Sequence, residues 1–441
     1  MMDGVSPDAA ASTGDAALQQ TDVLVIGGGP AGSTVATLLA RRGHHVTLLE
    51  KERHPRFHIG ESLLPANLPL LEQLGVAEQV RAIGMQKWGA EFVSPWDGRQ
   101  QDFRFAEAWD KSMPYAYQVR RSQFDEILIR NAAQAGAHVI EGCRVRSVEL
   151  QRGARVEARH QDGRRQHWQA RYLVDASGRD TFLASNLGVK RRNPRHNSAA
   201  IFGHFSGAER NPGERAGHIS IYWFDHGWFW FIPLHDGASS IGAVVWPYYL
   251  KSRSVPVREF FLATIAQCAP LARRLANATL ISEVEATGNY SYSSTRSHGE
   301  GYLLLGDAYA FIDPVFSSGV LLAMHSAFVG ADAVDACLRT PSRARAALRE
   351  FDRSLRCGPR EYSWFIYRVT TPTMRELLLA PRNLLRMKEA MLSVLAGDIF
   401  GSTPIWGSVR AFKLTYALFS LLHARRSVRA ARRRSINIRP V

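Results

Sequence analysis

The spacing of apolar and polar positions changes along the chain. Residues 23–26 form a short, continuous apolar run, which is typical of a buried parallel strand, and a helical pattern follows up to Arg42. A second strand is predicted at residues 45–49. From about residue 320 onward the apolar spacing is helical. Strand-like stretches separated by turn residues fill the middle of the chain, at residues 87–93, 143–150, 155–160, 219–224, 228–234, 239–246 and 302–305. This order predicts an α/β fold with a helical C-terminal region.

Neither end of the chain carries a targeting pattern. Residues 1–20 are small, polar and slightly acidic, and they lack the basic start and apolar centre of a signal peptide, so we expect a loose tail. No run of 18 apolar residues occurs, and no transmembrane span is predicted. The four cysteines form no CxxC pair, which indicates a reducing, cytoplasmic setting.

The charge of the chain is concentrated at its C-terminus. The 441 residues include 55 Lys and Arg against 40 Asp and Glu, a net charge of +15. No acidic residue follows Asp398, whereas nine basic residues do, so the first 398 residues carry only +6. Hydrophobic residues make up 46% of the chain, which excludes a disordered or collagen-like protein. Because most of the excess positive charge lies in one terminal segment, we expect no nucleic-acid partner.

A glycine-rich turn joins the first strand to the first helix. Glycines at this spacing permit a tight turn, bring the backbone close to a pyrophosphate and let the helix pack on the strand. The helix N-terminus adds free N–H groups for phosphates. Glu50, followed by Lys51, ends the next strand at the place where a carboxylate can bind ribose hydroxyls. The turn, which predicts a dinucleotide site, consists of Gly27, Gly29, Pro30, Ala31 and Gly32.

Three later segments decide which dinucleotide is expected. Residues 118–125, residues 175–179 and the pair Gly306-Asp307 resemble the signatures of the FAD-dependent monooxygenase and halogenase superfamily. The resemblance implies that Arg121 approaches the flavin nucleotide and that Asp307 binds its ribityl chain. A carboxylate at the end of a strand is well placed to accept hydrogen bonds from hydroxyls. We therefore expect FAD.

The segments at residues 57–65 and 84–90 resemble the flavin-dependent halogenases, in which a lysine at the position of Lys87 is catalytic. Its amine would hydrogen-bond hypohalous acid, or form a haloamine, and present an electrophilic halogen to a ring. The alternative is an ordinary solvated surface lysine. The same resemblance implies that the cofactor is contacted by Ile59, Gly60, Glu61 and Ser62.

Residues 227–233 match the WxWxIP motif of this family. Strand alternation places Trp228 and Trp230 on one face. The resemblance implies that these indoles separate the substrate from the flavin, so that halide rather than substrate is oxidised there. The alternative is an ordinary strand with an aromatic core face.

Residues 311–319 resemble the family's FxxPxxSxG signature and precede a predicted helix at residues 320–334. The resemblance implies that Ser318 and Gly319 hold the halide and that Pro314, Gly319 and Val320 contact the cofactor. A simple serine helix cap would give the same pattern. Tryptophan-type halogenases have an acidic residue where this chain has Phe316. This departure favours phenols and pyrroles, free or tethered to a carrier protein, with Phe316 in the substrate wall.

We expect three regions in the chain. Residues 1–20 form the tail, and residues 331–441 form the helical region with its basic end. Between them, at residues 21–330, a Rossmann-like FAD-binding domain is interleaved with a β-sheet substrate domain. The FAD-binding domain is assigned residues 21–95, 118–190 and 295–330, and the substrate domain residues 96–117 and 191–294.

The sequence thus predicts an FADH2-dependent halogenase of secondary metabolism, such as antibiotic biosynthesis, that uses O2 and chloride or bromide. No second glycine fingerprint marks a nicotinamide site, so a separate flavin reductase is the expected partner. No His, Cys and Asp cluster has metal-ligand spacing, and no metal is expected.

Two other functions stay open. An FAD-dependent aromatic hydroxylase or a geranylgeranyl-reductase-like enzyme would share the FAD signatures but would not need Lys87 or the two tryptophans. A non-enzymatic flavoprotein scaffold could use its arginine-rich tail to bind an acidic partner or a membrane. The apolar spacing at residues 406–421 predicts an amphipathic helix that lies against a membrane or against the protein's own substrate cleft.

Overall fold

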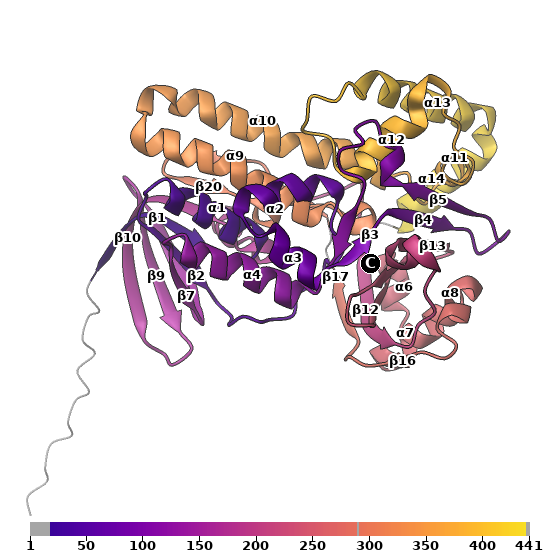
Figure 1. Cartoon of the computed structure of the whole chain (residues 1–441), viewed down its shortest axis with the longest axis horizontal. Helices are drawn as coiled ribbons and strands as arrows, with labels where there is room; N and C mark the ends of the chain where they lie inside the picture. The colour runs from indigo at the N-terminus through magenta and orange to yellow at the C-terminus, as the bar shows by residue number, and fades with distance from the viewer. Residues whose placement is uncertain (1–17, 289–290, 438–441) are drawn as a thin grey trace, which may run out of the picture.

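The structure is a computed structural model that describes residues 18–288 and 291–437. The predicted α/β fold is confirmed: two large sheets lie at the centre, and helices pack around them (Figure 1).

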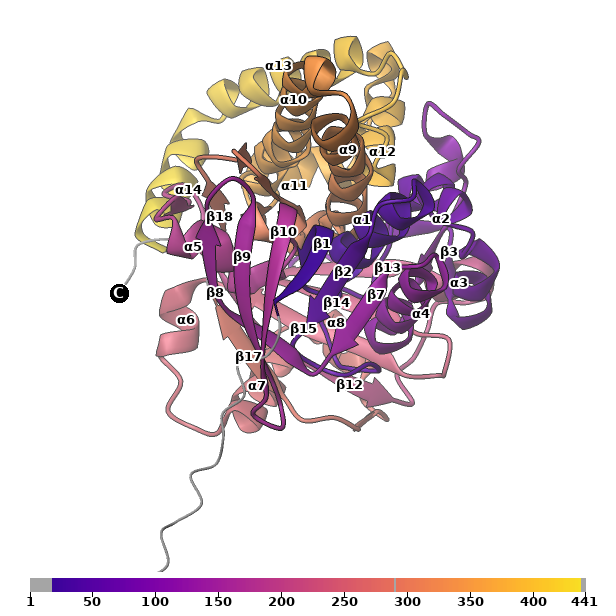
Figure 2. The ribbon, with the colours of Figure 1, turned by 90° about the vertical axis from the view of Figure 1, so that its left-hand side faces the viewer.

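The first sheet has a parallel centre. Its spatial order is β19-β20-β10-β1-β2-β7, and β8 and β9 extend it by antiparallel pairing from β10. β1 pairs in parallel with both β10 and β2, and Figure 2 shows these strands side by side. The strands are β1 (Gln19–Ile26), β2 (Val46–Glu50), β7 (His138–Glu141), β8 (Cys143–Leu150), β9 (Ala154–His160), β10 (Arg165–Asp175), β19 (His298–Gly299) and β20 (Tyr302–Leu304).

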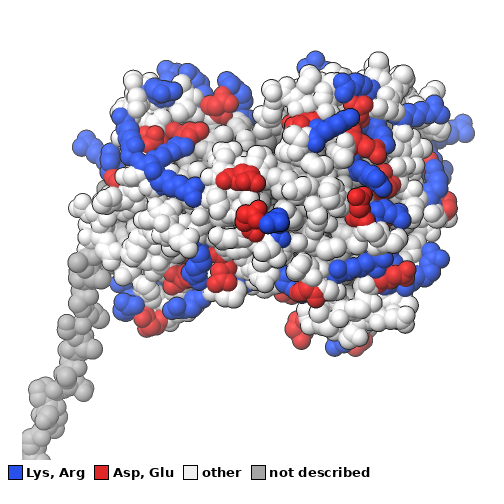
Figure 3. All heavy atoms as spheres, viewed as in Figure 1, with Lys and Arg blue, Asp and Glu red and all other residues white. Residues whose placement is uncertain are grey.

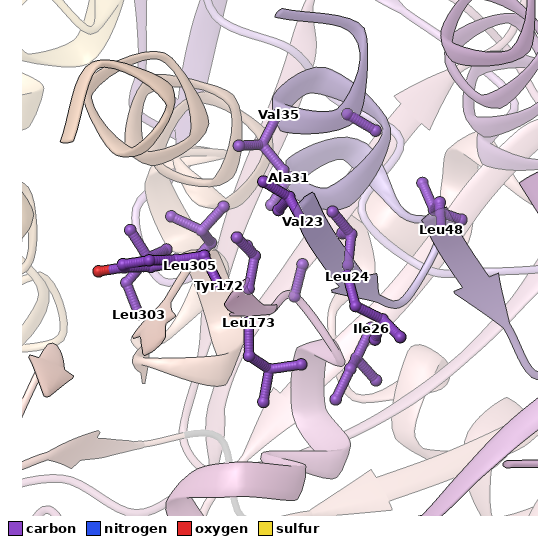
Figure 4. Packing of buried hydrophobic residues seen from close by; sticks show 14 of the residues in the cluster. Val23, Leu24, Ile26, Ala31, Val35, Leu48, Tyr172, Leu173, Leu303 and Leu305 are labelled. Carbon is purple, nitrogen blue, oxygen red and sulfur yellow. The ribbon is translucent and has the colours of Figure 1, made fainter. Parts of the chain in front are cut away.

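Helices cover one face of this sheet and bury its apolar strands. α1 packs against α4, α9 and the strands below it. Figure 4 shows Ala31 and Val35 of α1 pointing toward Val23 of β1, whereas Leu173 of β10 points away from α1; Leu303 belongs to β20, two strands from β1. All five of these side chains are buried. The helices of this part are α1 (Pro30–Arg41), α2 (Leu68–Leu74), α3 (Ala77–Ile83), α4 (Arg121–Gln134), α5 (Phe182–Asn186), α9 (Gly319–Arg339) and α10 (Pro341–Ile366).

The central strands of the second sheet are buried on both faces. The order of this sheet is β16-β12-β15-β14-β13-β4-β5, with β17 paired to β12. Every residue of β13, β14 and β15 is buried. The strands are β4 (Gly89–Val93), β5 (Gln100–Arg104), β12 (Ala199–Ser206), β13 (Ile219–Phe224), β14 (Gly227–Pro233), β15 (Ser239–Val245), β16 (Thr279–Leu280) and β17 (Glu285–Gly288).

Strand alternation divides the side chains of the second sheet between two cores. Phe229 and Phe231 pack toward α6 (Pro247–Lys251), α7 (Val257–Ala266) and α8 (Ala269–Arg274). Trp228 and Trp230 pack on the opposite face with residues of α10 and the C-terminal helices. The C-terminal helices are α11 (Pro372–Leu379), α12 (Met387–Ala396), α13 (Trp406–Leu422) and α14 (Ala424–Asn437).

Two small sheets accompany the two large ones. β3 (Met85–Lys87) pairs with β6 (Ala116–Gln118), and β18 (Tyr292–Ser294) lies between β11 (Lys190–Arg192) and β21 (Ala310–Phe311). Both lie next to predicted site residues.

Some expected boundaries differ from the structure. Residues 1–17 of the expected tail lie outside the described residues. The expected end of the tail at residue 20 is too late, because β1 begins at Gln19, which pairs with Trp168 of β10. The strand expected at residues 87–93 is two strands, β3 and β4. β4 pairs with β13 in the second sheet, so the expected limit of the FAD-binding domain at residue 95 does not match the sheet pairing. The wider division into domains stays a prediction.

Among the described helices, α9 alone has the length and hydropathy to cross a membrane. Half of its most apolar window is buried in the protein, and α9 packs between α1 and α10. This packing is that of a core helix. On the face shown in Figure 3, Lys and Arg are interspersed with Asp and Glu.

Replacing Gly242 of β15 with alanine is expected to destabilise the second sheet. A Cβ there would lie 2.1 Å from Cζ2 of Trp230, so the indole must move. We expect Gly242→Ala to lower the free energy of unfolding by about 1–3 kcal/mol, measured by chemical denaturation with near-ultraviolet circular dichroism. Gly288→Ala is the control, because nothing lies within 4 Å of its Cβ position. Equal stability of both variants would contradict this packing.

Candidate active site

The glycine turn can close only without side chains. Gly27 has φ +99°, and a Cβ there would lie 2.4 Å from the carbonyl oxygen of Ala176. A Cβ on Gly32 would lie 1.9 Å from the carbonyl oxygen of Gly27. A Cβ on Gly29 would contact only the end of the Arg56 side chain, at 3.7 Å. The turn therefore brings bare backbone to the start of α1, where the N–H groups are free for phosphates.

Glu50 ties the end of β2 to this turn. One of its carboxylate oxygens accepts from the amide of Gly28 at 2.6 Å, and the other accepts from the amide of Glu52 at 2.9 Å. Next to it, Lys51 pairs with Asp180 at 2.6 Å. Each carboxylate oxygen can accept more than one hydrogen bond, so ribose hydroxyls can still bind to Glu50.

A cleft runs from the glycine turn to the start of α9, and most of the predicted site residues line it. We call it the flavin cleft. Gly32, Lys87, Phe316 and Ser318 are the predicted site residues outside its lining. The predicted residues that line it are Gly27, Gly29, Pro30, Ala31, Glu50, Lys51, Ile59, Gly60, Glu61, Ser62, Arg121, Trp228, Trp230, Asp307, Pro314, Gly319 and Val320.

Arg121 is fixed by a partner that the sequence analysis did not identify. The buried carboxylate of Asp125, one helical turn on, accepts from Arg121 Nε at 2.7 Å and from Nη2 at 2.9 Å. Arg121 Nη1 donates to the carbonyl of Ile59 at 2.9 Å. The (i, i+4) spacing of an arginine and an aspartate was the available signal. This bidentate pair holds the guanidinium rigidly at the cleft wall.

Asp307 is a half-buried residue whose carboxylate lines the cleft. Its side chain accepts no hydrogen bond from the described residues. Burial raises the pKa of Asp307 to about 6, against the opposing effect of Arg121 and Arg179. A carboxylate that lines a cleft and has no hydrogen-bond donor from the protein is suited to accept hydrogen bonds from ligand hydroxyls.

Glu61 and Ser62 have partners behind the cleft wall. The Glu61 carboxylate lies 2.9 Å from Nε2 of the buried His204 in β12. Ser62 Oγ accepts from Lys87 Nζ at 2.9 Å, and Lys87 also donates to the carbonyl of Leu63 at 3.0 Å. Because Ser62 accepts from the lysine, its own hydroxyl proton can point elsewhere, including into the cleft.

Lys87 is only 1% exposed and has no carboxylate partner among the described residues. Burial lowers the pKa of its amine from 10.5 to about 7. Its Nζ lies 5.3 Å from the ring centre of Phe105. The amine is therefore available in both protonation states near neutral pH.

The loop before α9 is strained and contains an unsatisfied hydroxyl. Ser317 has φ +56°, in the left-handed region, and Ser318 precedes the first residue of α9. Ser318 Oγ is buried and has no hydrogen-bond partner within the described residues. With the free N–H groups of the helix start, it offers donors to an anion. We call residues 313–319 the halide loop.

A buried chain of hydrogen bonds holds the halide loop. One Asp313 oxygen lies 2.9 Å from Nε2 of His196 and 3.0 Å from Ser198 Oγ, and the other accepts from the amide of Val315 at 3.3 Å. Arg434 of α14 lies 3.2 Å from Nδ1 of His196. Since arginine can only donate, Nδ1 accepts and Nε2 carries the proton that binds Asp313. No local sequence signal joins residues so far apart.

The predicted aromatic wall is divided between two places. Trp228 and Trp230 line the cleft, with ring centres 6.1 Å apart. Phe316 instead packs with Tyr362 and Phe365 of α10, at centroid distances of 6.4 and 6.3 Å.

These features fit FAD. The side-chain-free glycine turn suits a pyrophosphate, and the unsatisfied carboxylate of Asp307 suits the hydroxyls of a ribityl chain. No group of three or more His, Cys, Asp or Glu side chains positioned for a metal occurs within the described residues.

Replacing Asp307 with asparagine is expected to separate stability from FAD affinity. The folded pKa of Asp307 exceeds its ordinary value of 3.8, so its contribution to stability decreases as pH rises from about 4 to 6 and stays lowered above that. Asp307→Asn should stabilise the FAD-free protein above pH 6 by about 2 kcal/mol, with no gain below pH 4.

FAD affinity of the same variant should fall about tenfold or more, because a charged acceptor is lost. Thermal unfolding across pH and flavin titration measure the two effects. Asp332→Asn, on an exposed side chain of α9, is the control. A variant with unchanged FAD affinity would remove Asp307 from the cofactor site.

Comparisons with known proteins agree with this geometry. A family model described as an FAD binding domain matches residues 20–346. The tryptophan 2-halogenase of Chondromyces crocatus is 38% identical over 330 residues, which are 71% of this chain and 61% of the relative. The chain thus spans less than two thirds of that relative's length.

Two further relatives match over most of their length. The 1H-pyrrole-2-carbonyl-(peptidyl-carrier protein) chlorinase of Pseudomonas fluorescens is 29% identical, over 86% of this chain and 89% of the relative. The solved structure of the myxobacterial chondrochloren halogenase, an FAD-dependent halogenase, is 34% identical, covers 88% of this chain and 93% of its own, and has a TM-score of 0.77. The chain therefore belongs to the flavin-dependent halogenases, a family of FAD-dependent oxidoreductases.

Proposed function

We propose that the chain makes hypohalous acid from O2 and chloride or bromide, and that Lys87 transfers the halogen to an electron-rich aromatic ring. The ring is a phenol or a pyrrole, carried as an acyl group on a carrier protein. When bound, reduced FAD would supply two electrons and two protons, which together with one further proton convert O2 and a halide ion into hypohalous acid and water. A separate flavin reductase supplies the reduced FAD.

The observation that carries this proposal is the buried amine of Lys87. A surface lysine would be solvated and charged, whereas this one is 1% exposed and has a pKa of about 7. Its neutral form has a free lone pair that can attack hypohalous acid to give a haloamine and water. Its protonated form can hydrogen-bond the acid and polarise the halogen. Both routes need an amine shielded from bulk water.

The location of Lys87 supports its separation from the flavin. Ser62 lines the flavin cleft and Lys87 does not, although the two are hydrogen-bonded. Trp228 and Trp230 occupy part of the same wall. In the proposed reaction a small acid such as HOCl passes between these side chains, whereas the aromatic substrate stays on the Lys87 side of them. This arrangement would keep the substrate away from the oxidising cofactor.

Halide binding is assigned to Ser318 and Gly319. The buried Ser318 hydroxyl lacks a partner, and space for a Cβ at Gly319 is open, since nothing lies within 4 Å of it. An anion next to the start of α9 gains from the helix dipole.

The substrate class rests on Phe316 and on the relatives. Phe316 packs among aromatic residues of α10, so this position carries no charge to bind a free amino acid. One relative is named for a carrier-bound pyrrole and another for tryptophan. Free tryptophan therefore belongs in any substrate panel as a comparison with phenols and pyrroles.

Family membership argues against the hydroxylase, the reductase and the non-enzymatic scaffold. The decisive assay incubates the protein with reduced FAD, O2, bromide and a phenol or pyrrole, supplied both free and as the acyl group of a carrier protein, and analyses products by mass spectrometry. Hydroxylated or reduced product alone would overturn the proposal.

Lys87→Met is expected to abolish halogenation while leaving flavin chemistry intact. Methionine keeps an unbranched side chain that is one heavy atom shorter and removes the amine. We expect product formation to fall at least about 100-fold, whereas flavin oxidation and peroxide release continue. Lys111→Met, at an exposed lysine, is the control. Halogenation by the Lys87 variant at the wild-type rate would exclude Lys87 from catalysis.

A further inference from the structure

A second cleft, of about 1200 Å³, adjoins the flavin cleft, because Phe311 of β21 lines both. Its walls come from β11, β18, α10, α11, α13 and α14. Figure 2 shows α14 running past β18, which agrees with their shared lining of this cleft. We call it the arginine cleft.

The described residues that line the arginine cleft include no Asp or Glu. The cleft is therefore strongly cationic. Its seven arginines are Arg191, Arg192, Arg195, Arg356, Arg360, Arg368 and Arg434.

Only two of these arginines have acidic partners. Arg356 pairs with Asp352 at 2.8 Å and Arg360 with Glu361 at 3.7 Å. The other five form no ion pair with any described residue. Uncompensated guanidinium groups repel one another, and an anion in the cleft would relieve that repulsion.

The guanidinium groups of Arg368 and Arg434 lie over aromatic rings. Arg368 is 4.4 Å from the ring centre of Trp364, and Arg434 is 5.4 Å from that of Tyr367. Stacking leaves the N–H edges of a guanidinium available to bind an anion. It also covers these ring faces, which a nucleotide base would otherwise use.

Arg434 connects the arginine cleft to the active site. It lines the cleft and also binds His196, which holds Asp313 of the halide loop. Among the described residues, α14 is thus both a wall of the cleft and a support of the catalytic loop.

We propose that the arginine cleft binds the phosphate of a 4′-phosphopantetheinyl group that carries the acyl substrate. The inference rests on the proposed function, in which the aromatic ring is an acyl group on a carrier. A concave site fits an inserted phosphorylated arm better than a flat anionic membrane. The arm can belong to a carrier protein or to coenzyme A, which share this phosphate.

Calorimetric titration of the flavin-loaded, full-length protein tests the inference. The probes are 4′-phosphopantetheine and pantetheine, which lacks the phosphate. We expect the phosphorylated probe to bind at least about tenfold more tightly. The double variant Arg195→Gln/Arg368→Gln should lose this preference, and Arg192→Gln should reduce it. Arg343→Gln/Arg345→Gln, on exposed arginines of α10 outside the cleft, should keep it.

Equal affinity of the wild-type protein for the two probes would overturn the inference. So would a control variant that loses the preference for the phosphorylated probe as fully as the Arg195/Arg368 double variant does. Titrations with a phosphopantetheinylated carrier protein and with coenzyme A identify the source of the arm, and failure of both to bind would also overturn it. Binding is measured without turnover. Intact binding without halogenation would count against the proposed function alone, and halogenation without binding against this inference alone.

Discussion

A lysine amine buried without a negative partner constrains the architecture around it. Removing an ammonium group from water costs several kcal/mol even after relaxation, and among the described residues only Ser62 Oγ and the Leu63 carbonyl are hydrogen-bonded to it. The fold must therefore supply enough packing elsewhere to retain Lys87. The central strands of the second sheet, buried on both faces, and the aromatic residues behind them supply such packing. The folded protein would be more stable with an uncharged, well-packed residue at this position. The presence of a lysine there is consistent with selection for a chemical role.

The parts of the active site come from segments that are far apart in the chain. The glycine turn and Glu50 come from the first sheet, the indole wall from the second sheet, and Lys87 from the short strand β3 between them. The halide loop begins α9 but is held through Asp313 and His196 by Arg434, near the C-terminus. The basic terminal helix is thus joined to this loop by a hydrogen bond. Of the described basic residues after Asp398, Arg434 lines the arginine cleft.

Local sequence patterns predicted much of this structure. The α/β class, β1, β2, β8, β13, β14 and β15, and the helix after the glycine turn follow from apolar spacing and turn residues, which act over a few neighbours. The position of β4 could not be predicted this way, because its membership of the second sheet depends on pairing with β13, more than 120 residues away. The same limit applies to the site. Motifs identified Arg121 and Asp307, but the contacts of Glu61 with His204 and of Asp313 with His196 join distant strands and loops.

The central claim is that burial alone holds the Lys87 amine close to half-protonated at neutral pH. The most direct measurement is an NMR titration of the flavin-loaded protein labelled with carbon-13 at the lysine ε-methylene, with the Lys87 signal assigned by its absence from a Lys87 variant. The account predicts a pKa of about 7 for Lys87. A value near the ordinary 10.5 would show that water or an anion compensates the charge, and would contradict the account.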